Sequence, residues 1–71
     1  MNTERIIKIV TMELAVDQIK LEDELERTIN SDLEINTKAS MIKSLLTRIT
    51  SNDASLAKFT SMVSNTNNNP D

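Results

Sequence analysis

The densest group of side chains that could bind a metal or act in catalysis is a cluster of carboxylates. Glu22, Asp23, Glu24 and Glu26 lie within five residues, and paired carboxylates can hold a metal ion or act as general acid and base. Carboxylate metal sites in helical bundles pair Glu with His, and calcium loops need a Gly at their turn, but the sequence contains neither residue type. We therefore interpret the acidic group as a solvated helix face, on which Asp23 and Arg27 attract each other across one turn.

Other kinds of site lack their residues as well. Nucleophilic catalysis would depend on Ser, Thr or Lys without help from Cys, His or Tyr, and no Gly-rich segment is present to cradle a phosphate or an oxyanion. Nucleic-acid binding favours a basic face, whereas this chain has a net charge of −3 and an isoelectric point near 4.8. The sequence thus argues against an enzyme, a cofactor, a metal site and a nucleic-acid partner.

The composition points to helices that pack against another chain. The 71 residues include one Phe, no Trp or Tyr, no Gly and a single Pro, at position 70, so little interrupts a helix. A core this small is rarely stable without disulfides, metal or association, and there is no Cys. We expect an all-α protein that gains stability from a partner.

A seven-residue repeat supports this fold class. One phase of the repeat is apolar at eight of its nine positions, Ile7, Leu14, Leu21, Thr28, Ile35, Ile42, Ile49, Leu56 and Val63. Apolar residues at this interval form the seam of a coiled coil. The sequence therefore predicts coiled-coil-like packing of two long amphipathic helices.

Polar residues between the helices predict an antiparallel hairpin. We expect one domain over residues 1–64, with a helix over about 3–30, a joint over about 30–36 and a helix over about 37–64. Asn2 or Thr3 would cap the first helix, and a capping box of Ser31 and Glu34 would start the second. The Asn-rich segment 65–71 is expected to be disordered. Residues 51–53 could break the second helix and start a third over 54–63; continuity is favoured because the repeat passes through.

Charge is distributed unevenly between the halves of the hairpin. Residues 1–34 carry four Lys/Arg and nine Asp/Glu, a net charge of −5, and residues 35–71 carry four and two, a net charge of +2. Folding back would bring opposite charges together, with a small gain in stability. Charged residues also interrupt every apolar window, and no signal peptide is visible. We therefore expect a cytoplasmic protein with no membrane segment.

Two apolar stripes run along the first helix when its residues are placed at about 100° intervals. A long stripe consists of Ile7, Val10, Leu14, Leu21, Leu25 and Ile29. A short stripe lies roughly opposite and consists of Ile9, Met12, Val16 and Ile19. The second helix carries one clean run, Ile35, Ala39, Ile42, Leu46 and Ile49. The long stripe suits this second helix, which leaves the short stripe without an intramolecular partner in a simple hairpin.

The short stripe is therefore the candidate partner-binding surface. A third helix over 54–63 could instead fold over it and close a three-helix bundle. Phe59 and Met62 are added to the candidate partner-binding residues, although Phe59 suits a core equally well and a Met is more often filler. The partner would be another helical protein, a second copy of the chain, or both.

The layout resembles that of a known family. A long amphipathic helix, a polar joint around 30–36, a second amphipathic helix, the absence of Cys and the acidic, Leu-spaced segment 21–26 are similar to the YscE-like and EscE-like co-chaperones of type III secretion systems. The resemblance covers residues 1–64 in layout and implies a hairpin that docks on a repeat-containing chaperone, the pair holding an aggregation-prone needle subunit. It carries over no functional residue, because the family offers no fixed motif.

Two further interpretations come from other classes of protein. A self-associating hairpin could form a dimeric four-helix regulator of plasmid or phage type. A coiled-coil scaffolding subunit could polymerise through the seam. The sequence alone does not separate these from a co-chaperone or adaptor.

Overall fold

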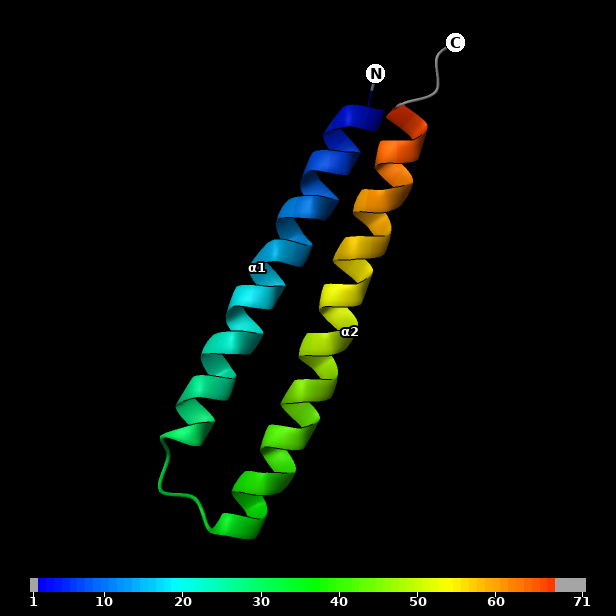
Figure 1. Cartoon of the computed structure of the whole chain (residues 1–71). Coiled ribbons are helices and arrows are strands. Elements are labelled where there is room, and N and C mark those ends of the chain that lie inside the picture. Colours follow the sequence, from blue (N-terminus) through cyan, green and yellow to red (C-terminus); the bar gives the residue numbers. More distant parts are fainter. Residues whose placement is uncertain (1, 68–71) are drawn as a thin grey trace.

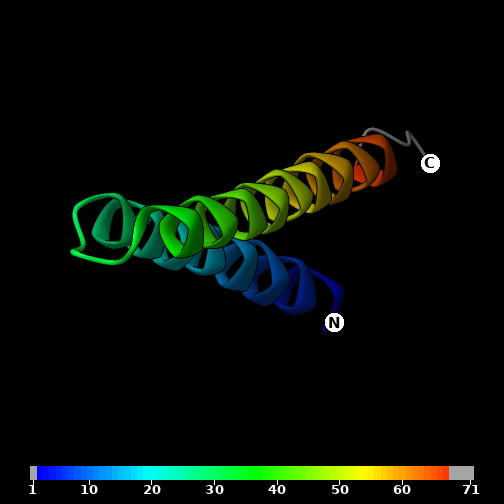
Figure 2. The same cartoon turned by 90° about the horizontal axis from the view of Figure 1, so that it is seen from below.

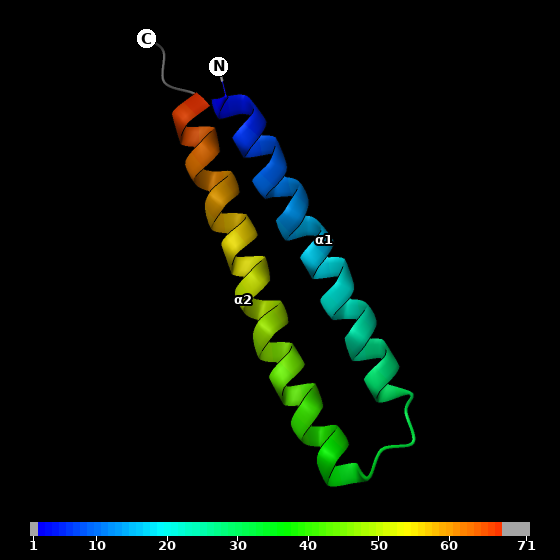
Figure 3. The same ribbon diagram turned by 180° about the vertical axis from the view of Figure 1, so that it is seen from behind.

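The computed structural model is an antiparallel helical hairpin (Figure 1). It describes residues 2–67, with side chains through residue 64. Helix α1 spans Thr3–Ile29 and helix α2 spans Ile35–Asn67. The rod measures 58 × 16 × 12 Å, and α1 begins at the same end of the rod where α2 finishes (Figures 1 and 3). Seen from below, the two helices are inclined to each other (Figure 2). The all-α hairpin predicted from the repeat is confirmed.

Helix α1 begins and ends through backbone contacts more than through side-chain caps. Asn2 occupies the N-cap position, but its side chain makes no capping hydrogen bond; its carbonyl accepts from the N–H of Ile6 at 2.9 Å. At the other end the Asn30 N–H donates to the Glu26 carbonyl at 3.1 Å. The Ser31 hydroxyl donates to the Thr28 carbonyl at 2.7 Å. Ser31 thus satisfies one of the carbonyls that a helix end leaves unpaired.

Glu34 caps the start of α2, and the predicted Ser31–Glu34 capping box is wrong. The Glu34 carboxylate accepts from the N–H groups of Asn36 at 2.9 Å and Thr37 at 3.3 Å. These contacts lower the pKa of Glu34 from its ordinary value of 4.5, with the Asn36 N–H as the main cause. Glu34 therefore acts as the N-cap residue itself, while Ser31 is engaged with α1. The Lys38 ammonium also donates to the Ile29 carbonyl at 3.0 Å and ties α2 to the end of α1.

Helix α2 is continuous across the polar segment 51–53, so the third helix over 54–63 and the closed three-helix bundle are absent. It begins two residues earlier than expected, and residues 65–67 are helical where disorder was expected. Helix propagates easily once nucleated, and no Gly or Pro stands before position 70. The remainder of the expected disordered segment, residues 68–71, lies outside the described residues.

The seam between the helices follows the seven-residue repeat closely. From α1 it takes Ile7, Val10, Leu14, Gln18, Leu21, Leu25 and Thr28, all partly or fully buried. From α2 it takes Lys38, Ile42, Leu45, Ile49, Asn52, Leu56, Phe59 and Val63, again partly or fully buried. The α2 set alternates spacings of four and three without a break, as a coiled-coil seam requires.

The seam departs from the sequence expectation at several positions. Ala39, expected in the apolar run of the second helix, is exposed, and Lys38 lies in the seam instead. Thr28 is buried at 6% exposure in place of Ile29, and Leu45 at 3% in place of Leu46. Ile35 is 76% exposed, although it belongs to the repeat. A seven-residue period keeps Thr28 in line with Leu21, whereas stepping at 100° drifts toward Ile29.

A charged residue explains the choice between Leu45 and Leu46. Leu46 shares its seven-residue column with Asp53, whereas Leu45 shares one with Asn52, Phe59 and Lys38, whose ammonium donates to the Ile29 carbonyl. Turning α2 to bury Leu46 would also carry the Asp53 carboxylate into the seam, and burying an unpaired charge is costly. The helix therefore presents the column of Leu45.

Little apolar surface is buried in this hairpin. Leu45 is the one buried large hydrophobic residue among residues 2–64. The expected attraction between oppositely charged helices also produces no ion pair between α1 and α2 within the described residues; the salt bridge found there joins Arg27 to Asp23 inside α1 at 3.1 Å. The structure thus depends on a narrow, half-buried seam.

Candidate interaction surface

The short stripe lies along the side of α1 that faces away from α2. Its four residues, Ile9, Met12, Val16 and Ile19, are 43–66% exposed. Ile9 and Met12 follow the seam residue Ile7 by two and five positions, and Val16 and Ile19 follow Leu14 in the same way. At about 100° per residue, both offsets place a side chain roughly half a turn from the seam. Together they form a continuous apolar surface over about three turns of α1, and no described part of the chain covers it.

The corresponding side of α2 has the opposite character. At the same repeat positions α2 carries hydroxyl side chains with one Ala and one Lys, namely Thr37, Ser40, Ser44, Thr47, Ser51, Ala54, Lys58 and Ser61, all exposed. This is the composition expected of a helix face in water. Large hydrophobic side chains are exposed elsewhere too, namely Ile6, Ile29, Leu33, Ile35, Met41, Leu46 and Met62. None of them lies on the outward face of α2, so the two outward faces differ in character.

Phe59 and Met62, the other candidate partner-binding residues, do not join the short stripe. Phe59 lies in the seam and is half-buried, which fits the core alternative for this residue. Met62 is 56% exposed and stands next to the seam residue Val63 on α2. Both belong to the helix opposite the one that carries the stripe, so the structure brings together four of the six candidate residues.

A pair of amide side chains inside the seam was not anticipated from the sequence. The Asn52 amide donates to the Gln18 side-chain oxygen at 2.8 Å and to the Leu14 carbonyl at 2.9 Å. From the sequence, segment 51–53, which contains Asn52, is interpreted only as a possible break in the second helix. The sequence does contain an indication of this position: Asn52 lies seven residues from both Leu45 and Phe59, and this interval predicts that it shares the seam with them. Gln18 likewise falls between the seam residues Leu14 and Leu21.

This pair fixes the register of the hairpin. Because Gln18 meets Asn52, residues of α1 and α2 lie side by side when their numbers add up to about 70. A polar residue in the middle of a mostly apolar seam specifies register, since any slip would leave it without a partner. The Gln18–Asn52 pair thus positions α2 along α1.

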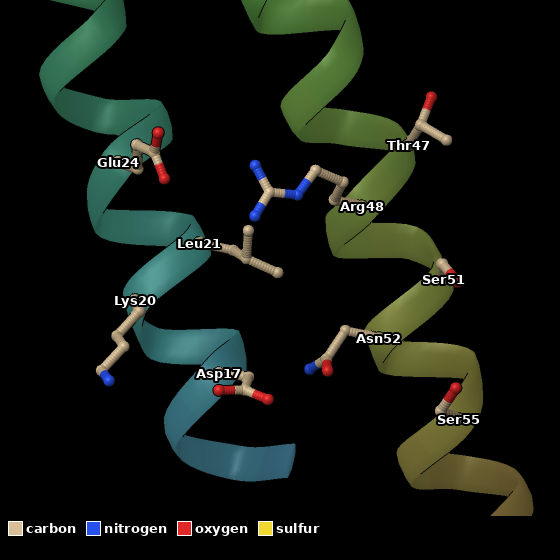
Figure 4. A pocket seen from close by; sticks show the side chains of 9 residues that line it. All are labelled: Asp17, Lys20, Leu21, Glu24, Thr47, Arg48, Ser51, Asn52 and Ser55. Carbon is tan, nitrogen blue, oxygen red and sulfur yellow. The ribbon is translucent and has the colours of Figure 1, made fainter. Parts of the chain in front are cut away.

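Next to this pair, a polar groove runs between the helices on one flank (Figure 4). It has a volume of about 670 Å³ and is lined by Asp17, Lys20, Leu21, Glu24, Thr47, Arg48, Ser51, Asn52 and Ser55. Arg48 extends from α2 toward α1 in this view, but it makes no ion pair with Glu24. Leu21 is the one aliphatic lining residue. The groove is open and lacks a converging set of donors or acceptors, so it does not resemble a small-molecule site.

Two further features of the helices bear on other functions. Within the part of the chain that the structure describes, no group of three or more His, Cys, Asp and Glu side chains could hold a metal ion. Neither helix, over the same residues, has a stretch long and apolar enough to span a membrane. The four acidic residues of segment 22–26 are all exposed on α1, while Leu25, which lies among them, is half-buried.

Comparison with known proteins adds no relative. No family model matches the chain, and no curated protein or solved structure matches it either.

Proposed function

We propose that this chain is a non-enzymatic protein-interaction module that binds another helical protein chain through the short stripe of α1. The observation that carries the proposal is the contrast between the outward faces of the two helices. The α1 face is apolar and exposed, while the α2 face carries six Ser and Thr residues with one Ala and one Lys. Exposed apolar patches on small proteins mark interfaces, and anchors at spacings of three and four suit a helix that packs into a helical groove.

The weakness of the hairpin core supports the same function. A chain of 71 residues that buries one large hydrophobic side chain has little apolar stabilisation of its own. Covering the short stripe would remove four further side chains from water, at roughly 25 cal/mol per Å² of apolar surface. Binding and stability are therefore coupled, because a partner that binds only the folded hairpin also stabilises it.

As the biological role we propose a small cytoplasmic co-chaperone or adaptor, in keeping with the layout that the chain shares with the co-chaperones of type III secretion. The repeat-containing chaperone of such a system would supply the helical groove. A scaffold that polymerises through the seam has less support, because the two helices of one chain already occupy the seam with each other. A self-associating hairpin uses the same stripe and is considered below.

The test replaces Val16 with Asp, in the middle of the short stripe, and uses Ala54→Asp on the outward face of α2 as the matched control. Light scattering measures the mass of each protein alone and co-expressed with a type III needle chaperone. We expect Val16→Asp to abolish every species larger than the monomer while keeping the helical circular dichroism, and Ala54→Asp to leave both unchanged.

Two results would overturn the proposal. One is a wild-type chain that stays a folded monomer at all concentrations and binds no co-expressed chaperone. The other is a complex that persists in Val16→Asp. Because association also stabilises the hairpin, helicity is compared at a concentration at which the wild type is monomeric. A loss of helicity there in Val16→Asp but not in Ala54→Asp would show that the stripe is internal core, contrary to its exposure in the hairpin.

A further inference from the structure

We infer that the short stripe pairs with the short stripe of a second copy of this chain, with the two α1 helices antiparallel. This inference rests on one part of the proposed function, that the short stripe is an interaction surface. A second copy on the stripe excludes a chaperone groove from it, so the two occupants are alternatives that the test separates. It depends on three features of α1: the spacing of the stripe, the charges that continue it, and the side of the helix on which it lies.

The spacing of the stripe is the same in both directions along the helix. Its residues are separated by three, four and three positions. When two copies align antiparallel about the midpoint between Met12 and Val16, facing residues have numbers that add up to 28. Ile9 then meets Ile19 of the copy and Met12 meets Val16, so every apolar layer finds an apolar layer, as in an antiparallel coiled coil.

The charges that continue the stripe select this orientation. In the same line along the helix, Arg5 precedes Ile9, and Asp23 follows Ile19. Antiparallel pairing sets Arg5 opposite Asp23 of the copy at both ends of the stripe, since 5 and 23 also add up to 28. Parallel pairing would set Arg5 against Arg5 and Asp23 against Asp23 in the same line. Like charges facing each other in an interface disfavour that arrangement.

The position of the stripe makes the contact sterically accessible. The stripe lies on the side of α1 opposite the seam, so a copy approaches without displacing α2 or the Gln18–Asn52 pair. The outward face of α2, rich in Ser and Thr, then remains in water. The product is a row of four helices with the two α1 helices at its centre.

Cysteine cross-linking tests the orientation directly, because the chain contains no Cys. Ile9→Cys and Ile19→Cys proteins, one of them labelled with ¹⁵N so that the products differ in mass, are mixed and oxidised. A disulfide needs Cα atoms about 4.4–6.8 Å apart. In the antiparallel pair the two copies of position 9 stand ten residues apart along the axis, about 15 Å at 1.5 Å per residue. We expect the mixed 9–19 disulfide to dominate over 9–9 and 19–19. Dominance of the like pairs would overturn the inference.

Charge reversal tests the same arrangement without cysteine. Arg5→Glu should weaken dimerisation by about tenfold at low ionic strength, and the loss should shrink in 1 M salt. Adding Asp23→Arg to the same chain should restore the dimer, while Lys58→Glu, with the same change of charge on the outward face of α2, should have no effect. Failure of the double variant to restore dimerisation, with helicity intact, contradicts the pairing.

The outcomes separate this inference from the proposed function. If the wild type is monomeric and binds the chaperone but Val16→Asp does not, the dimer is refuted and the interaction module is supported. If a complex or dimer persists in Val16→Asp, both the proposed function and the dimer inference are refuted. A dimer sensitive to Val16→Asp that forms like-pair disulfides would keep the interface and refute the antiparallel orientation.

Discussion

At the scale of single residues, two neighbouring leucines have different environments. Leu45 is 3% exposed and Leu46 is 47% exposed, although both could have joined the seam with spacings of three and four. The difference makes the pair a sensitive probe of how α2 is turned about its own axis. Leu45 is also the most completely buried apolar side chain of the seam.

We therefore predict that Leu45→Ala lowers the free energy of unfolding by about 2–5 kcal/mol, which is the range for a buried leucine. Leu46→Ala removes the same atoms from an exposed position and should change it by less than about 1 kcal/mol. Urea unfolding followed by circular dichroism gives both values. Equal losses would mean that α2 is turned so that both leucines share the seam.

At the scale of helices, the start of α2 depends on a charge. Glu34 is the residue whose carboxylate accepts the first free N–H groups of α2, and its pKa is lowered by those bonds. A carboxyl group whose pKa is lowered by folding stabilises the folded state above its unfolded pKa. That contribution is lost as the pH falls through the folded value.

The resulting prediction concerns Glu34→Gln, which keeps a side-chain oxygen but removes the charge. The wild type should melt at a higher temperature than Glu34→Gln near pH 7. The difference should fade as the pH falls below the ordinary pKa of 4.5, where the wild-type carboxylate becomes protonated. Thermal melts between pH 7 and pH 3 measure it. A difference in melting temperature that does not change with pH would show that the charge of Glu34 does not contribute to the cap.

Helices were predictable from the sequence because their signals are local and repeated. The seven-residue column and the absence of Gly were enough for two antiparallel helices, and the exposed position of the short stripe followed from its distance to the column. Details that depend on both helices were not predictable from one of them. Whether Leu45 or Leu46 enters the seam depends on Asp53 and Asn52 one turn or more away, and the role of Ser31 depends on where α1 ends.

At the scale of the whole molecule, an amide pair in the middle of the seam helps to specify how the rod is assembled, together with the Lys38–Ile29 contact near the loop. The Gln18–Asn52 pair lies in the half-buried seam and sets the alignment of two helices that otherwise present repeating apolar layers. Apolar layers repeated every seven residues match again after a shift of one repeat, whereas the amide pair does not. Alignment and stability therefore depend on different residues.

We predict a coupling of about 0.5–1.5 kcal/mol between the two amides, the usual net contribution of one hydrogen bond. It is measured by a double-mutant cycle of Gln18→Ala, Asn52→Ala and the double variant in urea. Replacing both amides with Leu should raise the melting temperature but yield a mixture of alignments, visible as broadened amide resonances. A single sharp set of resonances in that variant would show that the loop and the seam leucines suffice to set the alignment.

The hairpin also has two unlike poles. Helix α1 starts and α2 finishes at one pole, and the connecting loop forms the other, along a rod 58 Å long (Figure 1). Anything joined to either end of the chain is therefore held at the same pole. In an antiparallel pair of rods the two such poles would point in opposite directions. The pair would then act as a strut that keeps two attached bodies about 33 Å apart, the rise of the 22 residues that separate the two α1 starts.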